Sequence, residues 1–313
     1  MCQEKTKQLL YVVTAGSSYL DIDAYACSVA MSELLNLKGK KAVAFSGAPC
    51  NYSVCPPLKK ACALEETLPH GYAPDELQYI IVDVSDPDYI KDKVPLDKVT
   101  ALYDHHTGFE EYWTSRIGEN AHIEFIGAAA TLIYREWKSA GLTKKMRRST
   151  ALLLIAAILD NTLNITSSNT TDEDIQAYNE LCAKAGVGAD WRGYYFSEVQ
   201  KSIEADLKNA LFNDMKIIRD STVLPQNMAQ LCIWDAERII EKLPEIREWF
   251  KDFLGGWMIN IIDISRHCGY FVCDDAEVQK QFERIFDVRF EKGTAVSPIP
   301  YLRKEIIKIV NSN

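Results

Sequence analysis

Hydrophobic positions in the first part of the chain alternate between short β-rich runs and longer helical patterns. The apolar runs are LLYVVTAG (9–16), KAVAFSG (41–47), YIIVDV (79–84) and VTALYDHH (99–106), and the pattern predicts a helix from about residue 21 to residue 37. Strands that alternate with helices are typical of βαβ units, which build a mainly parallel sheet. We therefore predict an α/β fold whose N-terminal domain is a doubly wound, mainly parallel sheet.

The pattern becomes mostly helical between residue 128 and about residue 186. Glycines at positions 186, 188 and 193 then interrupt it, as is expected between domains. Four strand candidates follow, MKIIRD (215–220), MAQLCIWD (228–235), WMINIIDI (257–264) and YFVCD (270–274), together with two closing helices. We predict a first domain over residues 1–188, a linker near residues 186–195 and a smaller α/β domain over residues 195–313.

Composition and charge narrow the class of protein. The 313 residues are 47% apolar and 25% charged, which is typical of a folded globular chain. A net charge of −9 argues against binding of long nucleic acid, which draws its affinity from neutralised phosphates. The apolar run from Ala151 to Leu159 is too short to span a membrane, and the N-terminus lacks an apolar signal core. We expect a cytoplasmic protein that binds neither long nucleic acid nor a membrane.

Carboxylates and histidines stand where four apolar runs end: LDIDA (20–24), IVDVSD (81–86), YDHH (103–106) and ILDN (158–161). The carboxyl ends of parallel strands face a common crevice, so residues far apart in the sequence can meet there. Crowded carboxylates repel one another, and divalent cations are the usual way to keep them ionised. Each motif alone is weak, because an aspartate after a strand is often a helix cap. The ordered set, with Asp and His as donors, favours Mn²⁺, Co²⁺ or Mg²⁺ over a thiolate-bound metal.

These ordered motifs resemble the DHH phosphoesterase superfamily, which includes family II inorganic pyrophosphatases, exopolyphosphatases and prune proteins. The resemblance covers nearly the whole chain: HIEFIGAAATLIYREW (122–137) is similar to the family's Gly-Ser-x-Ala-Thr segment, and AAILDNTLNITSSNTTDEDI (156–175) is similar to its fourth motif. It implies two divalent cations, Mn²⁺ first and Co²⁺ or Mg²⁺ as alternatives, and these metal ligands: Asp21, Asp23, Asp83, His105 and Asp160. It also implies catalytic roles for Asp83 as the bridging ligand, for His106 at the substrate and for Asp104 in orienting a histidine.

The second domain resembles the DHHA2 type. ADLKNALFNDMKII (205–218) and PYLRKEIIKIV (300–310) are similar to its opening and closing segments. The resemblance implies that Lys208, Arg303 and Lys304 bind substrate phosphate together with His106. A solvated charge on an amphipathic helix is an equally weighted interpretation of these three basic residues.

The chain departs from the family pattern at three places. Ser17 stands where pyrophosphatases have a histidine, so one nitrogen ligand is missing. The fourth motif, LDNTLN, is one residue longer than the family pattern, so either Asp160 or Asn161 could fill the ligand position; a carboxylate binds a hard cation better, which favours Asp160. Thr166 and Leu302 replace the basic residue and the serine that the family carries there.

The resemblance implies a metal-dependent hydrolase of phosphoanhydride bonds, with pyrophosphate or short polyphosphate as the leading substrate. One alternative is a phosphodiesterase on short oligonucleotides or cyclic dinucleotides, although the glycine-rich GGGH segment of such enzymes is absent from the sequence. Another alternative is a catalytically weak phosphate- or nucleotide-binding regulatory protein. The expected partners are a small phosphate-containing substrate and, in a homodimer, a second copy of the chain.

Overall fold

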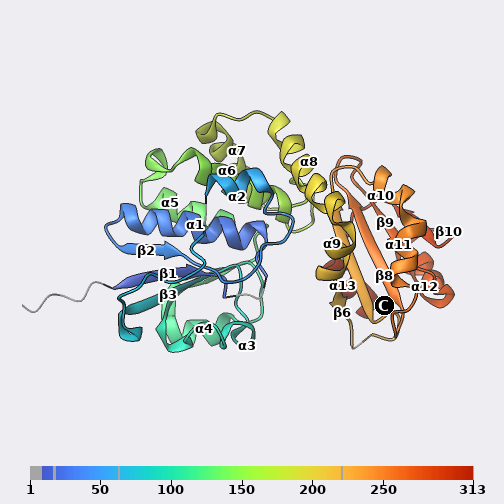
Figure 1. Ribbon diagram of the computed structural model, residues 1–313, viewed down its shortest axis with the longest axis horizontal. Helices are drawn as coiled ribbons and strands as arrows, with labels where there is room; N and C mark the ends of the chain where they lie inside the picture. The colour runs from blue at the N-terminus through green and yellow to red at the C-terminus, as the bar shows by residue number, and fades with distance from the viewer. Residues whose placement is uncertain (1–8, 17–18, 63, 220, 313) are drawn as a thin grey trace, which may run out of the picture. The chain divides into compact units, whose positions relative to one another are not determined.

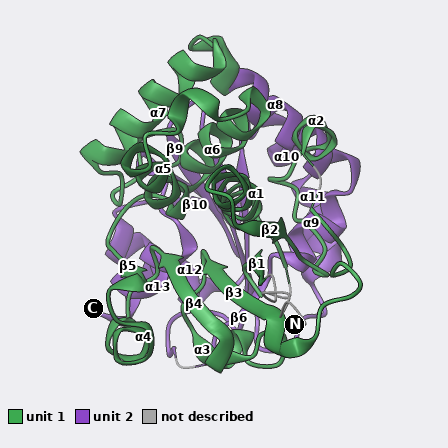
Figure 2. Ribbon diagram, turned by 90° about the vertical axis from the view of Figure 1, so that its left-hand side faces the viewer, with its two compact units in different colours: residues 1–192 green, residues 193–313 purple. Residues whose placement is uncertain are grey.

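The computed structural model describes residues 9–16, 19–62, 64–219 and 221–312. The chain divides into two compact units, Met1–Arg192 and Gly193–Asn313 (Figures 1 and 2). Within the described part of the chain, no helix combines the length and the apolar character needed to cross a membrane.

The first unit is built on a five-stranded sheet in which every neighbouring pair of strands is parallel. The strand order is β2-β1-β3-β4-β5. The strands are β1 (Leu10–Thr14), β2 (Lys41–Ala44), β3 (Leu77–Val82), β4 (Val99–Asp104) and β5 (Ala121–Ile123). This sheet confirms the predicted α/β class. Strand β5 has only three residues, Ala-His-Ile, which are too few to show a period, and the sequence pattern did not predict it.

Helices cover both faces of this sheet, as Figures 1 and 2 show. One face carries α1 (Ile22–Leu37), α5 (Ala129–Ser139), α6 (Arg148–Asn161) and α7 (Asp172–Ala185), and the other carries α3 (Pro87–Ile90) and α4 (Glu110–Ile117). The short helix α2 (Pro56–Ala61) lies in the connection after β2. Helices α1 and α6 are apolar almost all round and buried along most of their length, which is expected of helices enclosed by other helices.

A hydrophobic core lies between the sheet and the helices α3 and α4. Ile90 of α3 and Trp113 of α4 are fully buried there with Val12 and Ile81 of the sheet. The indole Nε1–H of Trp113 donates a hydrogen bond of 2.6 Å to the carbonyl oxygen of Ser85. The helix layer therefore fixes the loop that follows β3.

The second unit contains a six-stranded sheet in the order β10-β11-β9-β8-β7-β6, in which only β7 and β8 are parallel neighbours. Its strands are β6 (Lys216–Ile217), β7 (Asn227–Ile233), β8 (Trp257–Asp263), β9 (Cys268–Val272), β10 (Phe290–Glu291) and β11 (Thr294–Ser297). Its helices are α9 (Leu207–Asn213), α10 (Glu237–Glu241), α11 (Leu243–Phe250), α12 (Ala276–Phe286) and α13 (Arg303–Asn311). The hairpin of β10 and β11 separates the two closing helices and was not predicted, because its strands are too short to show a period.

The division between the two units falls within the segment predicted as a linker, residues 186–195, but part of that segment is helical. Helix α8 (Asp190–Ala205) begins within it, and Gly193 lies inside the helix. Tyr195, Phe196 and Val199 of this helix are buried, and the Phe196 ring stacks on Trp234 with centroids 5.8 Å apart. This packing outweighs the roughly 1 kcal/mol by which a glycine disfavours a helix interior.

Candidate metal centre

The candidate site lies at the carboxyl ends of β3 and β4. The strand order reverses between β1 and β3, and in open α/β sheets the crevice at such a switch point is where ligands bind. Asp83 directly follows β3 with φ at +59°, and its N–H donates a bond of 2.8 Å to the Tyr103 carbonyl oxygen. A left-handed residue other than glycine costs about 1–3 kcal/mol, and aspartate tolerates it better than most. This turn directs the Asp83 side chain toward the end of β4.

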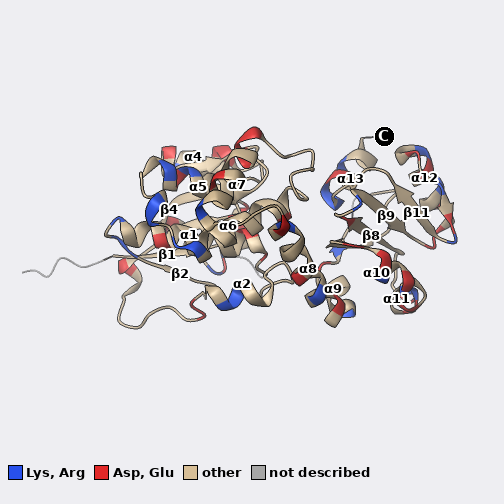
Figure 3. Ribbon diagram, turned by 90° about the horizontal axis from the view of Figure 1, so that it is seen from above, with Lys and Arg blue, Asp and Glu red and all other residues tan. Residues whose placement is uncertain are grey.

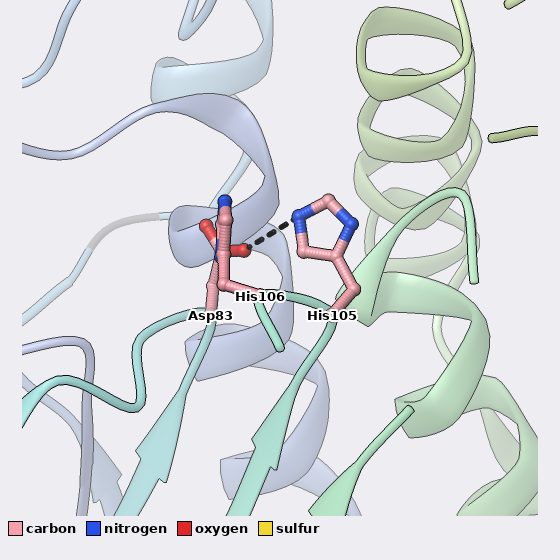
Figure 4. Close-up of side chains that lie close together, drawn as sticks. All are labelled: Asp83, His105 and His106. Carbon is pink, nitrogen blue, oxygen red and sulfur yellow. Dashed lines mark ion pairs between the residues drawn. The ribbon is translucent and has the colours of Figure 1, made fainter. Parts of the chain in front are cut away.

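Asp83, His105 and His106 form a close group of side chains (Figure 4). Their candidate ligand atoms all lie within 4.8 Å of one another. The His105 Nε2 atom is 3.4 Å from Asp83 Oδ1 and 4.0 Å from Asp23 Oδ2. The His105 Nδ1 atom lies 3.2 Å from the Ile126 carbonyl oxygen, which can only accept a hydrogen bond. Nδ1 therefore carries the hydrogen of the neutral ring, and Nε2 presents its lone pair toward the two carboxylates.

Asp104 holds the turn that carries both histidines. Its Oδ1 atom accepts hydrogen bonds from the His105 N–H at 2.8 Å, the His106 N–H at 3.1 Å and the His106 Nδ1 at 2.8 Å. Burial opposes ionisation, but the hydrogen bond and charge of His106, with contributions from Ser85 and His105, together lower the pKa of Asp104. The carboxylate is therefore ionised and orients His106, whose side chain remains 55% exposed.

Asp23 is a completely buried carboxylate at the N-terminus of α5. Its two oxygens accept the backbone N–H groups of Ala129 and Ala130, each at 2.8 Å, although these residues lie more than 100 positions further along the chain. Burial and then the charge of Asp21 raise the pKa of Asp23 to about 7, against the opposing effect of the two backbone bonds. Asp23 thus joins the start of α1 to the start of α5 and faces His105.

The carboxylates at this site repel one another. Burial, followed by the charges of Asp21, Asp23 and Asp104, raises the pKa of Asp83 well above its ordinary value. Within the described residues, the buried Asp83 Oδ1 has no hydrogen-bond donor. A divalent cation would satisfy this oxygen and offset the repulsion, and carboxylate oxygens with an imidazole nitrogen suit Mn²⁺, Co²⁺ or Mg²⁺. The residues present therefore fit a metal.

Asp174 supports the segment that contacts Asp23 and His105. One of its oxygens accepts the N–H groups of Gly127 at 2.9 Å and Thr171 at 2.8 Å, and the other accepts the Thr131 hydroxyl. A Cβ atom at Gly127 would lie 2.6 Å from the Asp174 carboxylate, so only glycine fits there. The sequence analysis did not single out Asp174, although Thr171 and Asp174 form a capping box that the spacing could have indicated.

Asp160 is not one of the three residues of this close group. The apolar run before it is the helix α6 and not a strand, and Asp160 is the penultimate residue of that helix. Among the described residues, the set of mutually close ligand atoms comes from Asp83, His105 and His106 alone. Beyond α6, residues 163–165 have φ values of 46°, 62° and 65°, a left-handed turn that accommodates the extra residue of this motif. Ser17 lies outside the described residues.

The three candidate phosphate-binding cations belong to the second unit. One Nη atom of Arg303 contacts the Asp214 carboxylate at 2.9 Å and the Met228 carbonyl oxygen at 3.0 Å, and the side chain is only 17% exposed. The Lys208 ammonium lies over the Phe212 ring, 5.6 Å from its centroid, and a similar distance from Trp249. Lys304 is exposed at the start of α13. Arg303 therefore has a structural partner within its own unit, whereas both lysines lie at the surface.

Comparison with known proteins identifies relatives along most of the chain. No protein-family model matches it. It is 26% identical over 309 residues to a probable manganese-dependent inorganic pyrophosphatase of Lactobacillus acidophilus, which covers 93% of this chain and 94% of the relative. A protein of the same name from Exiguobacterium is 22% identical over 95% of this chain and 96% of its own length. A third, from Bacillus licheniformis, is 28% identical, but the match spans 58% of each chain.

A solved structure shares the fold. The crystal structure of a putative family II inorganic pyrophosphatase from Methanococcus jannaschii superposes with a TM-score of 0.67 at 19% identity, and the match covers 97% of this chain and 99% of that one. At this identity the similarity shows the fold alone. The near-full-length relatives and the shared fold support the resemblance of this chain to the DHH phosphoesterase superfamily.

Proposed function

We propose that this chain is a divalent-metal-dependent phosphohydrolase that cleaves phosphoanhydride bonds, with pyrophosphate or short polyphosphate as its leading substrates. The observation that carries the proposal is the buried Asp83 Oδ1, which has no hydrogen-bond donor in the described part of the chain and faces the His105 imidazole at 3.4 Å. The names of the near-full-length relatives support the same chemistry.

Two cations would be held by these proposed ligands: Asp21, Asp23, Asp83, His105 and Asp160. When bound, such cations lower the pKa of a water molecule and offset the negative charge that gathers during displacement at phosphorus. Asp83 is suited to a bridging position because several other carboxylates face it and raise its pKa. The Ile126 carbonyl oxygen keeps the His105 ring in the tautomer that offers Nε2 as a ligand.

His106 is the proposed contact with the reacting phosphate. Its Nδ1 hydrogen is held by the ionised Asp104, which also stabilises the imidazolium form. A protonated Nε2 on the exposed side of the ring can bind a phosphate oxygen. It can then give its proton to the oxygen that leaves when the anhydride bond breaks, while water supplies the new oxygen on phosphorus.

The distribution of charge supports a small phosphate substrate. Figure 3 shows Lys and Arg interspersed with Asp and Glu over the helices of both units, and the net charge is −9. Lys208 and Lys304 are the surface cations proposed for a distal phosphate. We assign Arg303 the lesser part in binding, because Asp214 already holds its guanidinium.

The test is phosphate release from pyrophosphate and tripolyphosphate by chelated protein refilled with Mn²⁺, Co²⁺ or Mg²⁺. His106→Ala should lower turnover by about 10²–10⁴-fold, the usual contribution of a general acid. It should lower the thermal midpoint only slightly, because the side chain is mostly exposed and Asp104 keeps two backbone N–H donors. His70→Ala, at another exposed histidine, is the matched control. An unchanged rate in His106→Ala would remove this residue from the mechanism. No release with any metal, alongside tight phosphate binding, would favour a regulatory binding protein.

A further inference from the structure

A hollow of about 360 Å³ lies beside the metal centre within the first unit. Asp21, Asp83 and His106 of the candidate centre line it together with three aromatic residues, Tyr19, Tyr89 and Phe109. Pockets for small molecules start at about 300 Å³. The hollow is therefore large enough for more than the phosphoryl group that the metal centre would hold.

The charges around this hollow do not suit an anionic group away from the metal centre. Its charged lining side chains are the carboxylates of Asp21, Asp83 and Asp86, and none of the described lining residues is a lysine or an arginine. Cations at the metal centre would offset Asp21 and Asp83, but Asp86 would still face an additional anionic group without a basic partner. A like charge placed there is unfavourable, so the space away from the centre suits an uncharged group.

Phe109 and the residue next to Tyr89 pack against the core of the first unit. Tyr89 is 50% exposed, while the next residue, Ile90, is completely buried in the core beneath the sheet. Asp86 caps α3 by accepting the Asp88 N–H at 2.9 Å, and Phe109 packs against the same core. Aromatic side chains have only two rotatable bonds, so they lose little conformational entropy when a flat ligand stacks on them.

We propose that this hollow accepts the base of a nucleoside 5′-diphosphate, and that the enzyme hydrolyses such substrates in addition to inorganic phosphoanhydrides. The inference rests on the proposed function of the metal centre. Both phosphates lie at the metal centre, where cations would offset their charge, and the base stacks on Tyr89 and Phe109. Water oxygen bonds to the terminal phosphorus as its bond to the bridging oxygen breaks, and His106 gives that oxygen a proton. The products are orthophosphate and a nucleoside monophosphate.

The kinetic test compares ADP with pyrophosphate as substrates of the Mg²⁺-loaded protein. Loss of one base–aromatic stack corresponds to about a 5- to 140-fold change in affinity. Tyr89→Ala should therefore raise the KM for ADP, relative to that for pyrophosphate, by a factor in that range, and Tyr89→Trp should restore the ratio. Tyr194→Ala is the matched control, because Tyr194 is 49% exposed and lies outside this hollow.

A binding measurement supplies a readout that does not depend on turnover. In saturation-transfer NMR with the methylene-bridged analogue of ADP, the base protons should receive magnetisation from the protein, and Tyr89→Ala should weaken the signal. Pyrophosphate hydrolysis with neither ADP turnover nor a base signal would overturn this inference and leave the proposed function standing. Failure of every phosphoanhydride to react would overturn the proposed function and the inference together.

Discussion

Removal of divalent cations should make the stability of this protein fall as the pH rises from about 4 to about 7. Asp23 is completely buried, and burial together with the charge of Asp21 raises its pKa from 3.8 to about 7. Between these pH values the folded chain binds a proton that the unfolded chain has released. Each pH unit then lowers the free energy of unfolding by about 1.4 kcal/mol.

Over about three pH units, this effect of Asp23 alone amounts to about 4 kcal/mol of stability. The stability is fully present below the unfolded pKa of Asp23 and is lost as the pH rises through its folded pKa. Asp83 acts in the same direction, because its pKa is also raised. A bound cation replaces the proton as the partner of these carboxylates. Mn²⁺ should therefore restore the stability of the chelated protein at pH 8, where the deficit is complete.

Urea unfolding followed by tryptophan fluorescence, at steps from pH 5 to pH 8 with EDTA or with excess Mn²⁺, measures this effect. Other ionisable groups also titrate in this range, so the informative quantity is the difference between the wild-type protein and Asp23→Asn. The variant lacks the titrating group, and below about pH 7 its profile in EDTA should be flatter by about 1.4 kcal/mol per pH unit. Asp172→Asn, at an exposed position in the first turn of α7, is the control. Parallel profiles for the wild type and Asp23→Asn would refute the reasoning.

Two further substitutions test the surroundings of the centre. Gly127→Ala places a methyl group 2.6 Å from the Asp174 carboxylate and should lower the free energy of unfolding by about 1–3 kcal/mol, measured by calorimetry. Gly47→Ala, where the described neighbours leave open space, should lower it much less. Equal effects of the two would contradict the tight fit at Gly127. Asp104→Asn removes the ionised acceptor of His106 and should lower phosphate release about 10–100-fold, as the loss of groups that orient metal-site histidines usually does. Unchanged turnover would show that this orientation is unimportant.

The sequence predicted those parts of the fold that leave a periodic pattern. The apolar runs that became β1, β3 and β4 were recognised because each is a short apolar run bounded by polar residues. Strands β5 and β10, of three and two residues, contain too few positions to show a period. Gly193 was interpreted as a break in the helical pattern because its local preference is visible in the sequence, whereas the packing of Phe196 on Trp234, which favours a continuous α8, is not.

The sequence likewise predicted only those parts of the candidate site that lie in local motifs. Asp83, His105 and His106 were identified as candidates from local motifs, and the structure brings these three together. Contacts between distant segments could not be predicted from spacing. The Asp174 carboxylate accepts a hydrogen bond from the N–H of Gly127, which lies 47 positions away in the sequence. The tautomer of His105 depends on the Ile126 carbonyl oxygen, in a segment whose motif gave no sign of that role.

Anomalous diffraction at the manganese absorption edge, from crystals grown with Mn²⁺, would locate the ion directly. We expect a peak within bonding distance of Asp83 Oδ1 and His105 Nε2, in protein that releases phosphate from pyrophosphate when refilled with Mn²⁺. No peak between these two atoms, in protein that still shows manganese-dependent phosphate release, would contradict the assignment of this centre.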